Sequence, residues 1–179
     1  MARFVAFLRG INVGGKQLVK MKDLKEFFEE VNCSDVQTLL QSGNVIFASS
    51  ESDSMALEQN FETAFESQFG FFSDFILRDV DEIRDIIRDN PFAEMAETDP
   101  SHLVVIFFSE PVDPATVDLV NEKIVGREKI VPGSNYLYVS YPDGIGTSKV
   151  NRTPGWKELT SSGTARNWNT ILKVAAMFC

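Results

Sequence analysis

The order in which strand-like and helical hydrophobic patterns follow one another constrains the fold more than any other feature of the sequence. A compact apolar run comes first, and a segment with apolar residues at helical spacing follows it. Two strand-like runs then flank a tight Ser-Gly turn, which predicts a β-hairpin. The expected elements are, in order, a strand at 3–8, a helix at 21–31, strands at 36–40 and 44–48, a helix at 57–69 and a strand at 71–77. This βαββαβ order is that of a ferredoxin-like plait.

The second half of the sequence partly repeats this order. Asp79 and Glu82 resemble a capping box that opens a helix through Arg88, and Asn90-Pro91 ends that helix. The later elements are expected as a linker at 90–101, a strand at 102–108, a helix at 113–124, strands at 128–131 and 136–140 around a turn at 132–135, a helical turn from 153, and a last helix capped by Asn167.

Together the two halves predict an α+β protein with two ferredoxin-like, plait-like halves, mainly antiparallel sheets and a C-terminal helix. We place an N-terminal plait-like subdomain at 1–78, a helix and linker at 79–101, and a second plait-like subdomain with the C-terminal helices at 102–179. The final helix is expected to bury Trp168, Ile171, Leu172 and Ala175.

Two polar motifs near the ends of the chain are the main candidates for function, residues 9–16 (RGINVGGK) and 163–170 (GTARNWNT). They lie in the two basic parts of an acidic protein, whose net charge is −9. Residues 1–22 contain five basic and no acidic residues, and residues 145–179 contain five basic residues and one acidic residue. This partition predicts one anion-binding surface built from both motifs. The alternative is that these basic side chains are ordinary solvated surface.

The Gly-rich motif is not a P-loop, although Gly10 to Lys16 fits the pattern G-x-x-x-x-G-K. A P-loop requires Ser or Thr after the lysine to bind Mg²⁺, and Gln17 stands there. Its helix also begins at the lysine, whereas the helical pattern here begins later. The motif can instead expose backbone N–H groups to an anion, with Arg9, Asn12 and Lys16 around them. Its structural alternative is a tight loop that joins a strand to a helix.

Ten residues of the two motifs and of the first hairpin turn are candidate ligand contacts. They are Arg9, Asn12, Gly14, Gly15, Lys16, Ser42, Asn44, Arg166, Asn167 and Asn169. Arginine holds phosphate through two parallel hydrogen bonds, and asparagine both donates and accepts. Structural roles are the alternative, because Ser42 and Asn44 suit a turn. Asn167 likewise suits a helix cap, and Arg166 suits an ion pair with a neighbouring acid.

Catalysis and metal binding find little support in the residue types. His102 is the only histidine, so a His-based metal site is not available. Cys33 and Cys179 provide neither a disulfide framework nor clustered metal ligands. The N-terminal apolar run is too short for a signal peptide, and no apolar stretch suits a membrane helix. We therefore expect a cytoplasmic protein without metal, cofactor or membrane span.

Five segments of the sequence form a distinctive set of motifs: residues 9–16, Met21-x-Asp23-Leu24, residues 41–47 (QSGNVIF), Asn90-Pro91-Phe92 and residues 163–170. Together they resemble the bacterial family catalogued as domain of unknown function 1697. The resemblance implies a small cytoplasmic α/β protein with a plait-like fold and no established biochemical activity. Leu39-Leu40 stands where the family often has Thr-Tyr, so an aromatic side chain at that place is not part of any site here.

The function that we expect is binding of a phosphorylated or anionic ligand, either a nucleotide or a short single-stranded nucleic acid. Lys149 and Arg152, in a Gly/Ser-rich loop, can extend the basic patch of this site. The aromatic pattern of RNA-binding plaits is missing, which weakens the nucleic-acid form. Two alternatives stay open: a small metal-independent enzyme that acts on an anionic metabolite, and a protein-interaction module that uses a Phe-rich surface.

Overall fold

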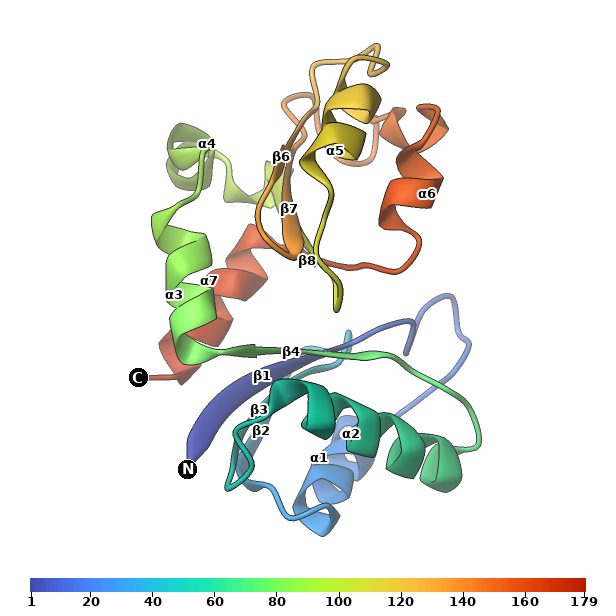
Figure 1. Cartoon of the computed structure of the whole chain (residues 1–179), viewed down its shortest axis with the longest axis vertical. Helices are drawn as coiled ribbons and strands as arrows, with labels where there is room; N and C mark the ends of the chain where they lie inside the picture. Colours follow the sequence, from blue (N-terminus) through green and yellow to red (C-terminus); the bar gives the residue numbers. More distant parts are fainter. The chain divides into compact units, whose positions relative to one another are not determined.

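Two four-stranded antiparallel sheets organise the chain (Figure 1). The computed structural model describes every residue from Met1 to Cys179. These residues divide into a first unit, Met1–Ile86 together with Val174–Cys179, and a second unit, Ile87–Lys173. Each unit contains one of the sheets, and the sequence-based prediction of an α+β protein with two plait-like halves is confirmed.

The first unit follows the predicted βαββαβ order. Its elements are β1 (Ala2–Leu8), α1 (Met21–Glu30), β2 (Ser34–Leu39), β3 (Asn44–Ser49), α2 (Ser54–Phe69), β4 (Phe75–Asp79) and the start of α3 (Val80–Arg88). The strands lie in the order β2-β3-β1-β4, and all neighbours are antiparallel. The last strand begins at Phe75 instead of 71, because Gly70 ends α2 in the left-handed conformation and a bend at 71 and a short irregular segment follow.

Phenylalanine side chains fill the space between the first sheet and its two helices, which cover the same face (Figure 1). Phe27 and Phe28 of α1 meet Phe61 and Phe65 of α2, with ring centroids 5.1 Å apart for Phe28 and Phe61 and 5.6 Å apart for Phe27 and Phe65. All four side chains are buried. The high Phe content of the sequence is therefore explained largely by this core.

The edge strand β4 is covered by carboxylates of α2. Glu58 accepts a hydrogen bond from the backbone N–H of Leu77 at 2.8 Å, and Glu62 accepts one from Phe75 at 3.2 Å. The two glutamates are about one helical turn apart on α2, and the two N–H groups that they bind are two residues apart on β4. These bonds satisfy donors that an open edge would present to another chain.

Side-chain caps begin two of the helices. Asp53 caps α2 by accepting hydrogen bonds from Met55 and Ala56. Asp79 and Glu82 form the expected capping box, because each side chain accepts a hydrogen bond of 2.8 Å from the other residue's backbone N–H. Local sequence signals therefore determine where these helices begin.

The second unit contains a sheet with the same strand order. Its elements are the end of α3, α4 (Ala93–Thr98), η1 (Pro100–His102), β5 (Leu103–Phe107), α5 (Pro114–Asn121), β6 (Lys129–Pro132), β7 (Tyr136–Ser140), η2 (Val150–Arg152), α6 (Trp156–Thr160), β8 (Thr164–Asn167) and the start of α7 (Trp168–Met177). The strand order is β6-β7-β5-β8, again antiparallel throughout. Helices α5 and α6 pack on one face of this sheet (Figure 1).

The second unit differs from the expectation in several details. The segment expected as a linker, 90–101, contains α4 and most of η1. Helix α5 ends at Asn121 instead of 124. Strand β8 was not predicted, because its polar sequence lies inside the C-terminal motif. In α7, Leu172 is 41% exposed, and Val174 is buried on the apolar face instead.

Candidate functional site

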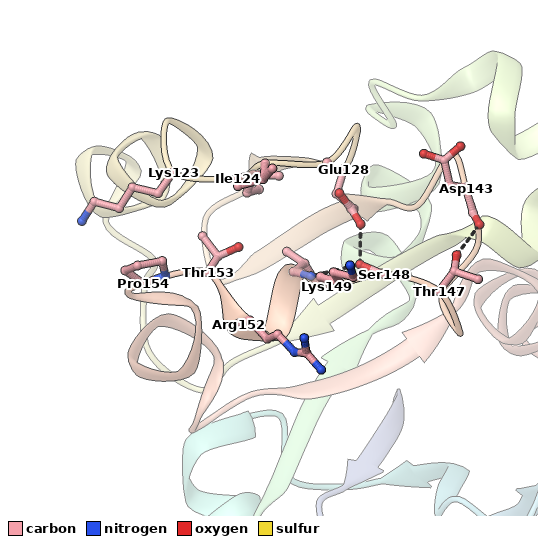
Figure 2. Close-up of a pocket in the computed structure, with 13 residues that line it drawn as sticks. Lys123, Ile124, Glu128, Asp143, Thr147, Ser148, Lys149, Arg152, Thr153 and Pro154 are labelled. Carbon is pink, nitrogen blue, oxygen red and sulfur yellow. Dashed lines mark hydrogen bonds between the residues drawn. The ribbon is translucent and has the colours of Figure 1, made fainter.

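The clearest concave site lies in the second unit. It is a pocket with a volume of about 400 Å³ between two loops (Figure 2). One loop follows α5 and contributes residues 123–128, and the other follows β7 and contributes residues from 143 to 154. Ligand pockets commonly have volumes of about 300–1,000 Å³. This pocket is therefore large enough for a small ligand.

Hydrogen bonds within the two loops define the walls of the pocket. Asn121, at the end of α5, donates to the backbone oxygen of Ile130 at 2.7 Å and accepts from its N–H at 3.0 Å, which closes the first loop. In the second loop, the N–H of Gly144 donates to the oxygen of Tyr141 at 2.9 Å. Gly144 has a φ of 93°, a conformation that favours glycine.

Three basic side chains stand at the pocket. Lys123 comes from the first loop, and Lys149 and Arg152 come from the second. All three are exposed, and none forms an ion pair with a carboxylate of the protein. Lys123 and Arg152 extend outward from the wall (Figure 2). Lys149 and Arg152 are the two residues that the sequence suggested as an extension of a basic patch.

A carboxylate faces the interior of the same pocket. Glu128 is half-buried and accepts a hydrogen bond from the hydroxyl of Ser148, which itself accepts one from the N–H of Val150 (Figure 2). Glu128 also lies close to Tyr141. Burial, together with the negative charge of Glu128, raises the pKa of this phenol to about 12. Tyr141 therefore stays protonated at neutral pH.

The glycine at position 126 determines where the Glu128 carboxylate can lie. A Cβ atom added to Gly126 would be 2.0 Å from Oε2 of Glu128, which is far inside van der Waals contact. The carboxylate thus occupies the space that any other residue at 126 would fill. The carboxylate thus lies between the open space at Gly126 on one side and its hydrogen-bond donor Ser148 on the other.

A second carboxylate at the pocket is already neutralised. Asp143 forms an ion pair with Arg127, and both side chains are exposed. The hydrogen bond from Arg127 lowers the pKa of Asp143. The hydroxyl of Thr147 donates to the backbone oxygen of Asp143 at 2.6 Å (Figure 2). Asp143 therefore contributes little net negative charge to the pocket.

The N-terminal motif forms an exposed hairpin-like loop, here called the Gly-rich loop (residues 9–17). The N–H of Asn12 donates to Gln17 at 3.1 Å, and the N–H of Lys16 donates to Val13 at 3.1 Å. Gly14 and Gly15 form the turn with φ values of 58° and 72°, the left-handed pair of a type I′ turn. Gly14, Gly15 and Lys16 are all exposed.

Asn12 holds this loop in place. Its side chain donates to the backbone oxygens of Val19 at 3.0 Å and Gln41 at 2.7 Å, and it accepts from the N–H of Val19 at 2.8 Å. The Gly-rich loop and the turn between β2 and β3 are therefore joined. Arg9 forms an ion pair with Asp74 at 3.0 Å with about two fifths of its side chain exposed.

The hairpin-turn candidates have local structural partners. Asn44 is fully buried and donates to the oxygen of Leu39 at 2.8 Å and to the hydroxyl of Ser42 at 3.1 Å. Gly43, between them, has a φ of 80°, and a Cβ atom there would be 2.7 Å from Cδ1 of Ile11. These contacts give the Ser-Gly-Asn turn a packing role as well as its proposed binding role.

The C-terminal candidates lie on β8 and at the start of α7. Arg166 is 6% exposed and donates to the hydroxyl of Thr164 at 2.7 Å and to the backbone oxygen of Ala165 at 2.9 Å. Burial lowers its pKa to about 10. Asn167 accepts from the N–H of Asn169 at 3.0 Å and donates to Ser101 at 2.8 Å, so it caps α7. The Asn169 side chain is exposed.

The candidate residues are distributed between the two units. The set from Arg9 to Asn44 belongs to the first unit, where the contact of Asn12 with the hairpin turn brings the two loops together. Arg166, Asn167 and Asn169 belong to the second unit. One surface shared by both motifs stays a prediction. The sequence did not reveal Lys123, Glu128 and Ser148, because nothing in their local pattern shows that their loops meet.

Two further observations concern metals and membranes. No group of three His, Cys, Asp or Glu side chains is arranged to hold a metal ion. The single histidine, His102, lies 2.8 Å from a carboxylate oxygen of Asp99. None of the helices has both the length and the apolar character needed to span a bilayer.

Comparison with known proteins identifies the family. Residues 1–138 match the family described as Protein of unknown function (DUF1697), and the chain belongs to that family. A solved structure, that of the conserved bacterial protein SP0830 from Streptococcus pneumoniae, is similar over 99% of each chain, with a TM-score of 0.77 and 22% sequence identity. This likeness shows a shared fold. No curated protein matches the chain significantly in sequence.

Proposed function

We propose that this member of the DUF1697 family is a binding module for a phosphorylated small molecule, and that the pocket of the second unit is its binding site. The observation that carries the proposal is the set of three exposed cations, Lys123, Lys149 and Arg152, at a concave wall built from two loops. Ammonium and guanidinium groups bind phosphate through charge-assisted hydrogen bonds, which are roughly twice as strong as neutral ones.

The dimensions of the pocket and the placement of the aromatic residues favour a small molecule over nucleic acid. A volume of about 400 Å³ is at the lower end of the usual range for ligand sites. Proteins that bind single strands stack bases on exposed aromatic side chains. Phe72 is the one aromatic residue among the large hydrophobic side chains that are exposed, and the net charge of −9 opposes a long polyanion.

The exposure of the cations sets the expected strength of binding. Each side chain that gathers over a ligand loses conformational entropy, at a cost of about 0.5–1.5 kcal/mol. An exposed ion pair contributes about 0.2–1 kcal/mol. Affinity must therefore come from several cations acting together and from contacts deeper in the pocket. Binding should weaken in 1 M salt, where the screening length falls to about 3 Å.

The Gly-rich loop is a second proposed anion contact. Its donors are Lys16 and the N–H groups of Gly14 and Gly15, which are exposed residues. Its hydrogen bonds through Asn12 keep the turn ordered, so an anion would meet donors that are already in position. Substitution of Lys16 tests this contact independently of the pocket, because Lys16 belongs to the first unit and the pocket to the second.

Calorimetric titration with phosphate-bearing small molecules tests the proposal. We expect Lys149→Ala and Arg152→Ala each to weaken binding by about 5-fold, and the double variant to weaken it further. Lys157→Ala is the matched control, since Lys157 is an exposed lysine of the same unit that does not line the pocket. Equal affinity of the double variant and the Lys157→Ala control would exclude the pocket as the site. A loss caused by Lys16→Ala would support the Gly-rich loop.

A further inference from the structure

We infer that the pocket selects phosphorylated compounds with hydroxyl groups on a single ring, and that Glu128 accepts hydrogen bonds from these hydroxyls. This inference rests on the proposed function and specifies the ligand class of the same site. It follows from the carboxylate that lies among the three cations.

An ionised carboxylate in a pocket imposes a requirement on the ligand. Oε1 of Glu128 accepts a hydrogen bond from Ser148, whereas Oε2 accepts none from the protein. A carboxylate has acceptors only, so Oε2 can be satisfied only by a donor on the ligand or by water. A bare phosphate offers no such donor, and the negative charge of Glu128 opposes its attraction to the three cations.

The Glu128 carboxylate is also held in position before a ligand arrives. Ser148 is itself fixed by the N–H of Val150, and the absence of a side chain at Gly126 leaves the space in which Oε2 lies. A pre-positioned acceptor discriminates among ligands more sharply than a mobile one, because less ordering is required on binding. The half-buried Glu128 therefore differs from the exposed cations around it.

Hydroxyl groups suit this acceptor better than an ammonium group does. Lys123, Lys149 and Arg152 carry three positive charges at the pocket. Asp143 is neutralised by Arg127, so Glu128 is the main negative charge against them. A ligand ammonium would meet a net positive surface, whereas hydroxyls donate hydrogen bonds without adding charge.

The apolar part of the wall favours a ring. Ile124, Val150 and Pro154 line the pocket beside the polar groups. Val125, also at the pocket, is fully exposed. The carbon face of a hydroxylated ring can lie against such residues while its hydroxyls reach Glu128 and its phosphate reaches the cations. With about 400 Å³ available, one ring fits better than two.

The test compares inositol 1-phosphate with cyclohexyl phosphate, which has the same ring and phosphate but no hydroxyls. Titration of the whole protein should show inositol 1-phosphate binding about 10-fold more tightly or more, as expected for hydrogen bonds to a charged group. Glu128→Gln should weaken inositol 1-phosphate and tighten cyclohexyl phosphate, because the repelling charge is removed. Glu158→Gln, a carboxylate outside the pocket, should leave the ratio unchanged.

Gly126→Ala provides an independent variant that changes no charge. Its new methyl group displaces the Glu128 carboxylate, so the preference for inositol 1-phosphate should fall as it does in Glu128→Gln. Three results would overturn the inference alone. They are equal affinity of the wild type for inositol 1-phosphate and cyclohexyl phosphate, an affinity ratio of these two that neither variant changes, and tighter binding of 2-aminoethyl phosphate, which carries an ammonium group, than of inositol 1-phosphate. Binding of neither phosphate overturns the proposed function and the inference with it.

Discussion

Removal of the Asn12 side chain should destabilise the first unit and loosen the Gly-rich loop. The side chain makes three hydrogen bonds, two with the backbone of Val19 and one with the oxygen of Gln41. Val19 is buried, so water cannot readily replace the lost partners. Asn12 also has a φ of 54°, a conformation that asparagine tolerates better than most residues do.

The size of the effect follows from these contacts. A hydrogen bond contributes about 1 kcal/mol, so Asn12→Gly, which keeps the left-handed conformation accessible, should cost about 3 kcal/mol of the free energy of unfolding. Asn12→Ala should cost about 1 kcal/mol more, since the Cβ atom of alanine makes the left-handed conformation at this position unfavourable. For a protein of this size, a loss of about 3 kcal/mol corresponds to a lower Tm by about 6–12 °C.

Asn32 offers a matched control for the measurement. It has a φ of 66°, is exposed, and its side chain makes no hydrogen bond within the protein. In urea unfolding followed by circular dichroism, Asn32→Gly should change the free energy of unfolding by less than about 0.5 kcal/mol. If Asn12→Gly destabilises the protein no more than Asn32→Gly does, the three hydrogen bonds do not hold the loop and the reasoning is refuted.

Three further predictions concern burial. Burial raises the pKa of Glu58, so its contribution to stability is complete below the unfolded value of 4.5 and is lost as pH rises through the folded value. Relative to wild type, Glu58→Gln should gain free energy of unfolding between about pH 4.5 and pH 7 in urea titrations; a constant difference would contradict this. Gly43→Ala should lower the Tm by several degrees, because its Cβ atom would meet Ile11 at 2.7 Å and its φ is positive. Burial raises the pKa of Cys33 to about 12, so a maleimide at about pH 7.5 should modify the exposed Cys179 and leave Cys33 unmodified in mass spectrometry of the native protein.

The first unit was predictable because each of its elements buries one clearly marked face. Helix α1 has apolar residues at helical spacing, and Leu24, Phe27 and Phe28 are buried. Short strand-like runs flank the Ser-Gly turn, and the turn has the positive φ at Gly43 that such a connection needs. Caps at Asp53 and Asp79 mark where the helices begin.

Strand β8 could not be predicted, because burial there does not follow residue type. Thr164 and Arg166 are buried polar residues, and Ala165 between them is exposed. The strand pairs with β5 through its backbone, and Arg166 donates to the hydroxyl of Thr164 and to the backbone oxygen of Ala165. A buried guanidinium has no signature in hydrophobic periodicity, so the sequence indicates only a ligand motif in this segment.

The pocket could not be predicted for a different reason, which is the length of the segments that connect strands and helices in the second unit. In the first unit, α1 is joined to β2 and β3 to α2 by the short segments 31–33 and 50–53. The equivalent connections of the second unit, 122–128 and 141–155, are longer and form the pocket. The first unit instead has its long connection between β1 and α1, where the Gly-rich loop lies. The two units therefore share one topology but have their long connecting loops at different places in it.

Neither pocket loop has a hydrophobic periodicity that predicts its structure. That the two loops meet follows only from the strand order of the sheet, which the units share. A variant of the full-length protein in which a short connection with the sequence of 50–53 replaces residues 141–155 should keep the second sheet and lose phosphate binding. Circular dichroism would verify the sheet, and calorimetric titration would measure the binding. Retained binding with an intact sheet would exclude the pocket and favour the Gly-rich loop, the other proposed anion contact, which belongs to the unit that the replacement leaves unchanged.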